Sequence, residues 1–411
     1  MKYVSGPYFQ GQLLKDINEI EIALTERFIY GGAITDAAEQ KSWRDRILEA
    51  SMGRNTVLYD DQGNPSIMVI VPLMTEAELL DGGREVPHPA FIVNGVTKPR
   101  LYISKYQNFT VGSSTTLRAV GLKHRDPGNT INFDTALLAC KQKGAGWHLM
   151  TNAEWAAIAL WAKKQGFWPR GNNSYGKDIN IQTEKGIPSY FHDYGGTTGK
   201  RIGRTLTGSG PISRSHDGTP FGIFDLNGNV WEWVGGLRLK IGEIQILENN
   251  NAADNTKDQS DTSTEWKAIL PDGTLVAPGT NGTYKFDSPA AGTGGTANLG
   301  TPILNTAITN SGYPTDPTSN GYYDYNYSYF KDLQIASGLS VANILKLLGI
   351  VPIDSNYKNG GLWVRNYGER LPFRGGSWDY GSYAGLFALA LFDPRSYAYV
   401  HVGFRSAYVN L

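Results

Sequence analysis

The sequence predicts an α+β fold, and three features of the 411-residue chain favour this class. Two separate regions have the periodicity of amphipathic helices, one before residue 50 and one between residues 132 and 161. Short β-branched and apolar segments from about residue 65 onward are typical of strands. The chain also contains 49 Gly, 20 Pro and 23 Tyr, which favours turns, loops and aromatic packing over long helices.

Residues 1–62 are predicted to form a helical module. Apolar residues recur at spacings near three and four from 13 to 24, and again at Trp43 and Ile47. A Gly-Gly pair at 31–32 separates the two patterns, which predicts two helices joined by a turn. The module is too small to form a core alone. It is therefore either a cap on the main domain or an attachment or oligomerisation element.

The main domain, residues 63–411, opens with strand patterns at 67–73, 90–93 and 101–103. Two helices are expected to follow these strands.

Asn132 is the expected N-cap of the first helix, which Gly144 ends. Thr151 and Glu154 form a capping box at the start of the second helix. The chain's only cysteine, Cys140, lies on the apolar face of the first helix, which predicts a buried structural thiol and excludes an internal disulfide.

The segment 225–233 allows two interpretations. Asp225, Asn227 and Asn229 alternate as the oxygen ligands of a calcium loop do, but the spacing and the closing glutamate of an EF-hand are absent. Asn-Gly at 227–228 is also a tight-turn signal, and the alternating tryptophans that follow are typical of a core strand. The structural interpretation is favoured; a structural calcium ion is the alternative.

Residues 237–368 are predicted to form a mostly β insertion. The segment is low in charge and rich in Gly, Thr, Asn and Tyr, and a loop of this length without structure is improbable. It contains the tyrosine-rich stretch 321–330 and a helix-like apolar stretch at 341–350. The tyrosines either extend a ligand-binding surface or pack against the main domain.

The C-terminal segment 373–405 is expected to organise the rest of the chain. Apolar residues alternate from 387 to 392, which predicts a strand with its odd positions facing a core and its even positions facing outward. The odd positions are Phe387, Leu389 and Leu391, and the even ones are Ala388, Ala390 and Phe392. After a turn at 393–394, the aromatic run 397–401 is either a second buried strand or a ligand-binding face.

The segment ends, FRGGSW and VGFRSA, together with 222–233 and 147–155, resemble the C-type-lectin-like fold of the formylglycine-generating enzyme family. The C-terminal pattern is similar to the variable proteins of diversity-generating retroelements, which include phage tropism determinants. The resemblance implies that an adenine-mutating reverse transcriptase rewrites chosen Asn codons between these ends. It also implies a homotrimer.

The resemblance, with the outward strand positions and the aromatic run, gives eleven candidate ligand-binding positions. They are Asp379, Tyr380, Tyr383, Ala390, Phe392, Asp393, Tyr397, Ala398, Tyr399, Val400 and His401. Mutating the adenines of an Asn codon with a pyrimidine third base never gives Lys, Glu, Gln, Met or Trp. None of these five residue types occurs at the eleven positions.

Several function classes are disfavoured. A net charge of +0 with 18% charged residues argues against binding nucleic acid through phosphate contacts. No apolar stretch is long enough to span a bilayer, and the first residues lack the apolar core of a secretory signal. The paired cysteines with which formylglycine-generating enzymes hold copper are absent, as are zinc, nucleophile-elbow and phosphate-loop motifs.

The sequence therefore predicts a non-catalytic, hypervariable ligand-binding protein without a cofactor. The favoured role is receptor binding at the tip of a phage tail fibre, as part of the virion. Its partners would be a host cell-surface protein or glycan and other tail or virion proteins, with no nucleic acid and no membrane insertion. One alternative is a diversified binding protein in the bacterial cytoplasm or at the cell surface. The other is an oxidase or a further enzyme, in which His401 pairs with Asp379 or Asp393 as an acid–base group.

Overall fold

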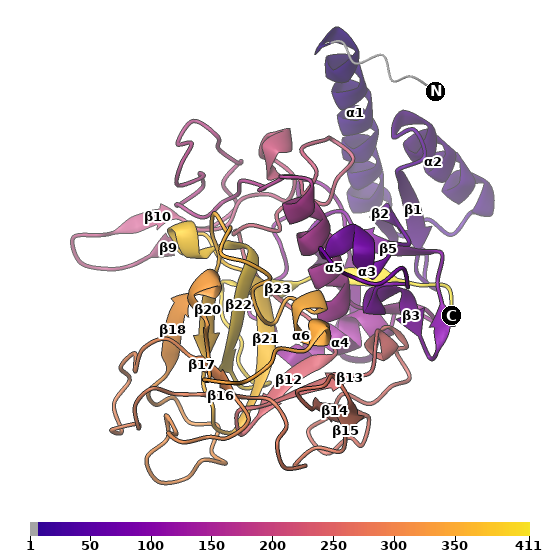
Figure 1. The fold of residues 1–411 in the computed structure, drawn as a ribbon. Coiled ribbons are helices and arrows are strands. Elements are labelled where there is room, and N and C mark those ends of the chain that lie inside the picture. The colour runs from indigo at the N-terminus through magenta and orange to yellow at the C-terminus, as the bar shows by residue number, and fades with distance from the viewer. Residues whose placement is uncertain (1–6) are drawn as a thin grey trace.

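A computed structural model describes residues 7–411, with side chains from Lys15 onward, so the first six residues of the helical module lie outside it. The helices are α1 (Pro7–Gly31), α2 (Ala37–Ala50), α3 (Glu76–Leu79), α4 (Phe133–Lys141), α5 (Asn152–Lys164) and α6 (Asn343–Leu347). The helices are interspersed among long runs of consecutive strands, and helices and sheets pack on one another (Figure 1). The predicted α+β class is confirmed.

The two helices that follow the first strands begin where local capping predicts. The Asn132 side chain accepts a hydrogen bond from the Thr135 backbone N–H at 2.9 Å. At α5, the Thr151 hydroxyl accepts from the Glu154 N–H at 3.1 Å, and the Glu154 carboxylate accepts from the Thr151 N–H at 2.9 Å. These bonds satisfy amide groups that have no partner within the helix.

The smaller sheet joins the start of the chain to its end. Its strand order is β1 (Asn55–Tyr59), β2 (Pro65–Pro72), β5 (Arg100–Ser104), β24 (Ser406–Tyr408) and β8 (Trp147–Leu149). The predicted boundary at 62/63 falls in the turn between β1 and β2, which pair antiparallel. The strand expected at 90–93 is shorter than predicted, because Pro89–Phe91 forms a 3-10 turn capped by the His88 side chain and only Ile92–Val93 is extended.

The larger sheet carries the C-terminal segment. Along its main path the strands are β18 (Asn326–Tyr329), β20 (Gly361–Val364), β22 (Gly385–Asp393), β21 (Glu369–Gly375), β12 (Leu237–Lys240), β13 (Glu243–Leu247), β16 (Lys285–Asp287), β17 (Ile303–Asn305) and β19 (Gln334–Ile335). Off this path, β11 (Trp231–Trp233) pairs with β21 and β23 (Val402–Phe404), and β14 (Trp266–Ile269) pairs with β13 and β15 (Leu275–Val276).

Three short hairpins complete the strand inventory of residues 7–411. They are β3 (Ile92–Val93) with β4 (Val96–Thr97), β6 (Phe109–Val111) with β7 (Arg118–Val120), and β9 (Phe191–Asp193) with β10 (Lys200–Ile202). The β9–β10 hairpin projects from the body at the left of Figure 1.

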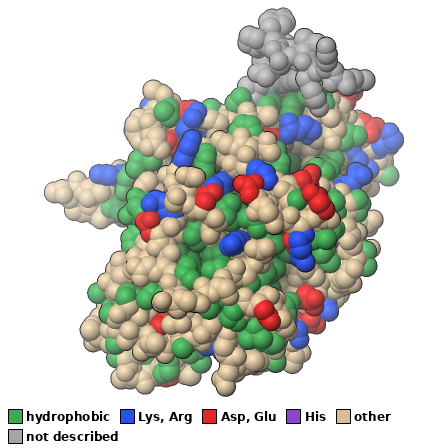
Figure 2. Space-filling model, in the orientation of Figure 1, with side chains coloured by type: hydrophobic (Ala, Val, Ile, Leu, Met, Phe, Trp, Pro, Cys, Tyr) green, Lys and Arg blue, Asp and Glu red, His purple; other side chains and the backbone are tan. Residues whose placement is uncertain are grey.

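Most strands of the 237–368 segment belong to the larger sheet, because β12 pairs with β21 and β20 pairs with β22. The insertion and the C-terminal segment therefore share one sheet. In Figure 2 the lower part of the molecule, where these strands lie, shows few charged side chains and many hydrophobic and neutral ones. This agrees with the low charge of the segment.

The N-terminal helices pack on the main domain through an apolar cluster and a buried ion pair. Ile17 and Leu24 of α1 are fully buried against residues of the smaller sheet and its hairpins. Between them, the Glu21 carboxylate accepts a hydrogen bond from the Lys105 ammonium at 2.6 Å and another from the Tyr106 hydroxyl at 2.6 Å. The side chains of Glu21 and Lys105 are both 0% exposed.

Replacing Glu21 tests this attachment. Glu21→Ala leaves the Lys105 ammonium buried without its anion, so we expect the free energy of unfolding to fall by about 3–5 kcal/mol. Glu26→Ala, at an exposed position of the same helix, is the matched control and should change it by less than about 0.5 kcal/mol. Denaturant unfolding measures both, and equal small losses would contradict a buried ionic attachment.

Candidate ligand-binding site

Strand β22 is the floor of the candidate site and is buried on both faces. Its odd positions, Phe387, Leu389 and Leu391, pack in the main core, as predicted, and the Trp155 indole N–H of α5 donates to the Leu386 carbonyl at 2.7 Å. The prediction that the even positions face solvent is wrong for Ala388 and Ala390, which are 0% and 5% exposed. A second apolar cluster, which includes Trp231 and Phe373, covers this face. Phe392, at the end of the strand, is half-buried.

A surface hollow of about 340 Å³ opens above this second face, and it is called the aromatic hollow below. Its lining comes from β11, β20, β21 and β22, from the connection between β21 and β22, from the loop after β22 and from the insertion. The lining residues are Trp231, Tyr322, Tyr325, Trp363, Phe373, Tyr380, Ala390, Phe392, Asp393, Tyr397 and His401.

Edge-to-face contacts hold the rings of the hollow in place. The Trp231 ring lies 5.4 Å from Trp363 at an interplanar angle of 87°, and 5.1 Å from Tyr380 at 84°. On another side, Tyr325 meets Phe392 at 5.1 Å and 78°. This arrangement places the positive edge of one ring against the negative face of the next, so the walls are rigid before any ligand arrives.

The structure brings six of the eleven predicted positions together in the aromatic hollow: Tyr380, Ala390, Phe392, Asp393, Tyr397 and His401. Tyr383 lies beside it, stacked at 4.4 Å on Tyr329, and Tyr399 is 45% exposed and lies 4.9 Å from the His401 ring. Exposed Asp379 accepts a hydrogen bond from the Tyr194 hydroxyl at 2.8 Å. Ala398 and Val400 are half-buried in the loop. Contact of these residues with a ligand stays a prediction.

The loop 394–401 between β22 and β23 has no regular secondary structure, so its aromatic run is not a second buried strand. Four of its carbonyl groups accept hydrogen bonds from outside the loop. The Phe133, Thr130 and Trp231 backbone N–H groups donate to residues 395, 399 and 401 at 3.1, 2.9 and 2.8 Å, and the Arg204 guanidinium donates to residue 400 at 2.7 Å. The loop is therefore anchored through its backbone.

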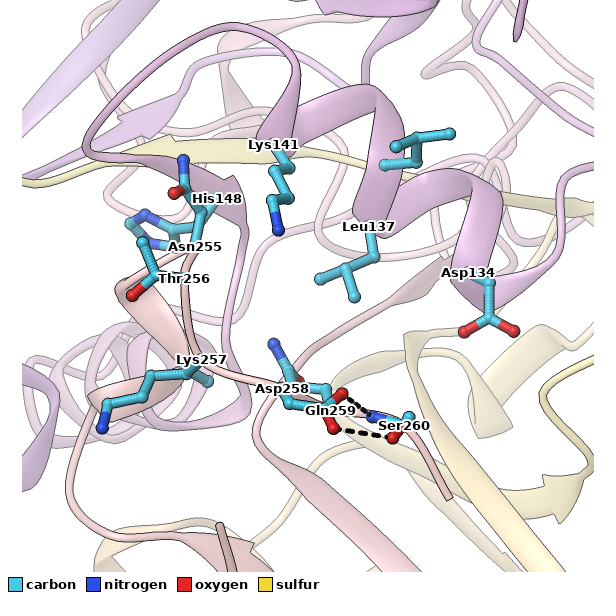
Figure 3. A pocket seen from close by; sticks show the side chains of 12 residues that line it. Asp134, Leu137, Lys141, His148, Asn255, Thr256, Lys257, Asp258, Gln259 and Ser260 are labelled. Atoms are coloured by element: carbon cyan, nitrogen blue, oxygen red, sulfur yellow. Dashed lines mark hydrogen bonds between the residues drawn. The ribbon is translucent and has the colours of Figure 1, made fainter. Parts of the chain in front are cut away.

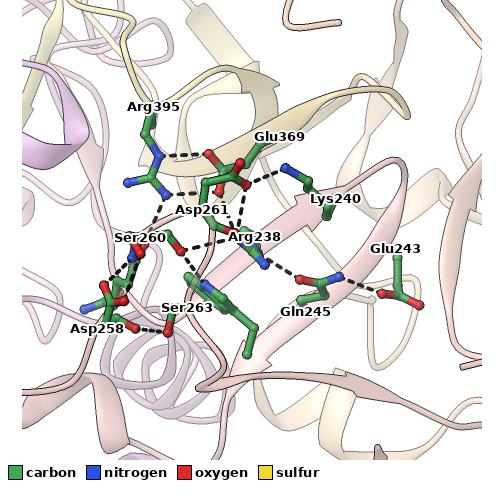
Figure 4. Close-up of polar contacts among 12 residues, drawn as sticks. Arg238, Lys240, Glu243, Gln245, Asp258, Ser260, Asp261, Ser263, Glu369 and Arg395 are labelled. Atoms are coloured by element: carbon green, nitrogen blue, oxygen red, sulfur yellow. Dashed lines mark hydrogen bonds and ion pairs between the residues drawn. The ribbon is translucent and has the colours of Figure 1, made fainter. Parts of the chain in front are cut away.

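Arg395 is the one side chain of this loop that acts as an anchor. Its guanidinium donates to both carboxylate oxygens of Glu369, at 2.8 and 3.0 Å (Figure 4). It also pairs with Asp134 at 2.5 Å. Glu369 also accepts from Arg238 at 3.0 Å, which links the loop to β12. The sequence interpretation missed this residue, although an arginine beside variable aromatic positions was a visible signal.

Tyr322 and Tyr325 show that the insertion contributes to the aromatic hollow. The sequence left open whether the tyrosine-rich stretch reaches the C-terminal segment, because nothing local fixes its position. Pairing of β18 with β20, and of β20 with β22, brings it there. Trp363, on β20, is a further lining residue that the sequence interpretation did not single out.

Asp393 has an unusual environment for a carboxyl group. It is 7% exposed, and its closest ionic contact is the Arg365 guanidinium, 3.9 Å away. No hydrogen bond from a described residue reaches its carboxylate, whose oxygens keep some contact with solvent. Burial raises the pKa of Asp393 to about 7, although the positive charges of Arg365 and Arg370 oppose the rise.

His401 does not form the acid–base pair considered above. Within the described residues its ring is 3.5 Å from the Tyr397 hydroxyl and makes no hydrogen bond to Asp379 or Asp393. Burial lowers the pKa of His401 to about 4, so the ring is neutral near pH 7. A histidine with so low a pKa and no carboxylate partner is a weak general base.

Both asparagines of the 225–229 turn are held by protein hydrogen bonds, whereas one carboxylate oxygen of Asp225 is buried without a partner among the described residues. The Asn227 amide donates to the Pro169 carbonyl at 2.8 Å, and the Asn229 amide donates to Gln107 at 2.8 Å. Asn229 also accepts from the Thr205 N–H at 2.8 Å. These contacts give both asparagines a structural role. Within the described part of the chain, no group of three or more His, Cys, Asp or Glu side chains is arranged to hold a metal ion.

A second hollow, of about 300 Å³, lies between α4 and the loop 255–260 (Figure 3). Leu137 and Lys141 of α4 face the loop across it, and Asp258 bonds to Ser260 within the loop. None of the eleven predicted positions lines it. The predicted residues therefore favour the aromatic hollow as the candidate site.

Arg395→Met tests the anchoring of the loop. The change removes the bonds to Glu369 and Asp134, so we expect the free energy of unfolding to fall by about 1–3 kcal/mol and amide exchange of 394–401 to accelerate. Hydrogen-exchange mass spectrometry measures the second effect. Arg100→Met, at an exposed arginine, is the control. Unchanged exchange in the loop would show that the backbone bonds alone hold it.

Asp393→Asn tests the buried carboxyl. In the unfolded chain this group ionises near pH 4, so between about pH 4 and 7 the folded state keeps a proton that the unfolded state has lost. Its contribution to stability is greatest at low pH and is lost as the pH rises through 7. Relative to the variant, the free energy of unfolding of the wild type should fall by about 2–3 kcal/mol between pH 5 and pH 8. Parallel pH profiles in denaturant unfolding would contradict this.

Residues 101–242 match the family model described as sulfatase-modifying factor enzyme 1-like domain. No curated protein sequence matches the chain.

Similar solved structures include the Treponema denticola variable protein 1, with 12% identity, a TM-score of 0.31 and coverage of 87% of this chain and 99% of that one. PvdO from Pseudomonas aeruginosa has 13% identity and a TM-score of 0.29, with 86% and 98% covered. The M1 variant of the Major Tropism Determinant has 11% identity and a TM-score of 0.29, with 87% and 72% covered. The family match covers residues 101–242, and over these residues the chain is similar to a sulfatase-modifying factor enzyme 1-like domain, as the resemblance in its sequence predicts.

Proposed function

We propose that this protein is a non-catalytic, hypervariable ligand-binding protein whose ligand contacts the aromatic hollow and the loop 394–401. The observation that carries the proposal is the anchoring of that loop through its carbonyl groups. Backbone acceptors are the same for every residue type, so the side chains of Tyr397, Ala398, Tyr399 and Val400 can be exchanged without losing these bonds.

The side chains at this face suit a binding surface. Tyrosine and phenylalanine rings supply a large contact area with few rotatable bonds, and small residues such as Ala398 leave room between them. The rings also lie on a rigid support, because β22 is buried and the ring contacts fix the walls. A preorganised aromatic surface of this kind loses little entropy when a ligand binds.

The favoured biological role is receptor binding at the tip of a phage tail fibre, with a host cell-surface protein or glycan as the ligand. The similarity of the C-terminal pattern to tropism determinants supports this role, and so does the absence of the five residue types that adenine mutagenesis of Asn codons never produces. A homotrimer attached to other virion proteins would add affinity through multivalent contact. A diversified binding protein of the bacterial cytoplasm or surface is the alternative. In the described part of the chain, each helix is too short or too polar to cross a bilayer.

A catalytic role has little support from the residues present. Formylglycine-generating enzymes use a cysteine pair, whereas the only cysteine here, Cys140, is buried in the second apolar cluster. Burial raises the pKa of this thiol, which keeps it protonated and unreactive. His401 lacks a carboxylate partner among the described residues, as shown above.

Exchange of the loop side chains tests the proposal. A variant with Asn at Tyr397, Ala398, Tyr399 and Val400 should keep its free energy of unfolding within about 1–2 kcal/mol, because the loop carbonyls keep their donors. Its binding to immobilised envelopes of candidate host bacteria should fall at least tenfold. Trp231→Ala is the contrasting variant, since loss of this buried ring should cost about 3–5 kcal/mol. Unfolding of the Asn variant, or unchanged binding, would contradict the proposal.

The gene neighbourhood gives an independent test. We expect a second copy of the DNA for the C-terminal segment, with Asn codons at the eleven positions, next to a reverse-transcriptase gene. Tail genes beside them would favour the phage role over the cellular one. A sulfatase gene without such a copy would favour the enzyme interpretation.

A further inference from the structure

The aromatic hollow has mainly aromatic walls and, at its floor, one carboxyl group that accepts no hydrogen bond from a described residue. Nearly all of its lining is aromatic, and its volume of about 340 Å³ is that of a small ligand site. Asp393 lies at the edge of the floor, more than nine-tenths buried, and accepts no hydrogen bond from any described residue. A carboxyl group at the surface of a hollow that no protein donor occupies is available as an acceptor for a ligand that supplies a donor.

The positive charges around Asp393 disfavour a cationic ligand. The guanidinium of Arg365 is 3.9 Å from the carboxylate and stacks on Phe392, with its Cζ atom 3.6 Å from the ring centre. Buried Arg370 adds a second positive charge that acts on the same carboxyl group. An ammonium or guanidinium group of a ligand would therefore be the third cation beside one carboxylate, and it would be repelled.

An anionic ligand is disfavoured for a different reason. Arg365 donates to the carbonyls of Tyr323 and Phe392, at 3.2 Å in both cases, and Arg370 donates to the carbonyls of residues 319, 320, 321 and 367. Neither guanidinium lines the hollow. An anion in the hollow would face the Asp393 carboxylate without a direct cationic donor. The remaining class is a neutral ligand with hydroxyl or amide donors.

The aromatic walls narrow the chemical class of the neutral ligand further. Half-buried Trp363 and Tyr380 present ring surface that packs well against an apolar face, and both rest on the buried Trp231 ring. His401 adds a neutral ring nitrogen as a second polar group at the rim. A pyranose sugar has both parts, since one face carries mainly C–H groups and its edge carries several hydroxyl donors. An alcohol or phenol side chain of a protein has a single hydroxyl and no such edge.

We propose that the aromatic hollow binds a neutral pyranose unit of a glycan, whose C–H face packs on the aromatic walls while its hydroxyl groups donate to Asp393. This inference rests on the proposed function, because it assigns a ligand class to the same face. It makes Asp393 the polar residue that orients the sugar. The half-buried rings of Trp363, Tyr380 and Phe392 supply the contact area, and the buried Trp231 ring supports them from below.

Titration with small probes tests the ligand class. The panel contains methyl glycosides of neutral hexoses, 6-deoxyhexoses, pentoses and N-acetylhexosamines, and binding is followed by saturation-transfer NMR and tryptophan fluorescence. Tetramethylammonium and N-acetyl-lysinamide serve as cationic probes, and N-acetyl-tyrosinamide serves as a protein-like hydroxyl probe. We expect saturable binding of at least one glycoside in the millimolar range and none of the cations.

Two variants of Asp393 separate hydrogen bonding from charge. Asp393→Asn keeps an acceptor oxygen of similar shape, so glycoside affinity should change by less than about threefold. Asp393→Leu removes every acceptor and should weaken the glycoside at least about tenfold, the loss of one good hydrogen bond. Asp81→Leu is the matched control, because the Asp81 side chain is 99% exposed and does not line the hollow. Thermal unfolding checks that each variant is folded.

The outcomes distinguish this inference from the proposed function. Saturable cation binding that is lost in Asp393→Asn would overturn the sugar assignment and identify a cation site. Binding of the tyrosine probe alone would also overturn it and favour a protein receptor. If no glycoside binds, but exchange of the loop residues still abolishes binding to envelopes, the sugar inference fails while the proposed function stands. If envelope binding is also unaffected by the loop, both fail.

Discussion

The geometry of the candidate site depends on one buried ion pair, between Arg405 and Glu232. The guanidinium meets the carboxylate in a bidentate contact of 2.6 and 2.7 Å, and it also donates to the carbonyls of Ser104 and Phe224 at 2.9 Å. The two side chains are 0% and 1% exposed. Arg405 directly follows β23, so the pair fixes this strand beside β11 and ties the larger sheet to the smaller one. Loss of either partner would leave a buried charge, which is a strong constraint on this region.

Because β23 is fixed in this way and β22 lies between β20 and β21, both ends of the loop 394–401 leave buried strands. The backbone donors to the loop carbonyls then determine its course. The atoms that stabilise the loop are thus different from the atoms that can contact a ligand. Main-chain groups and Arg395 hold the loop, while Tyr399 is exposed and half-buried Tyr397 lines the aromatic hollow, where both can contact a ligand.

Local signals in the sequence were sufficient for the helices, but the environment of the site depends on distant pairings. Asn132 and the Thr151–Glu154 box cap their helices within four residues, so periodicity and capping predicted α4 and α5. The alternation of apolar residues also predicted that Ala390 lies on the face of β22 opposite the main core, but it did not predict that this face is buried. That face is covered by β11, which pairs with β23 across about 170 residues of chain, as the register of Trp231 with Val402 shows. The place of Tyr322 depends in the same way on the pairing of β18 with β20.

The two-sided burial of β22 also limits which of the eleven positions can vary freely. Ala390 is in register with Phe373 on one neighbouring strand and with Trp363 on the other, so its methyl group lies between two rings. A larger residue would overpack this site, and a buried polar one would need a hydrogen-bond partner that the rings do not supply. Tyr399, in contrast, is nearly half exposed and faces neither limit. Diversity is therefore expected to concentrate at the rim of the aromatic hollow, while the floor keeps the small residues that give the hollow its depth.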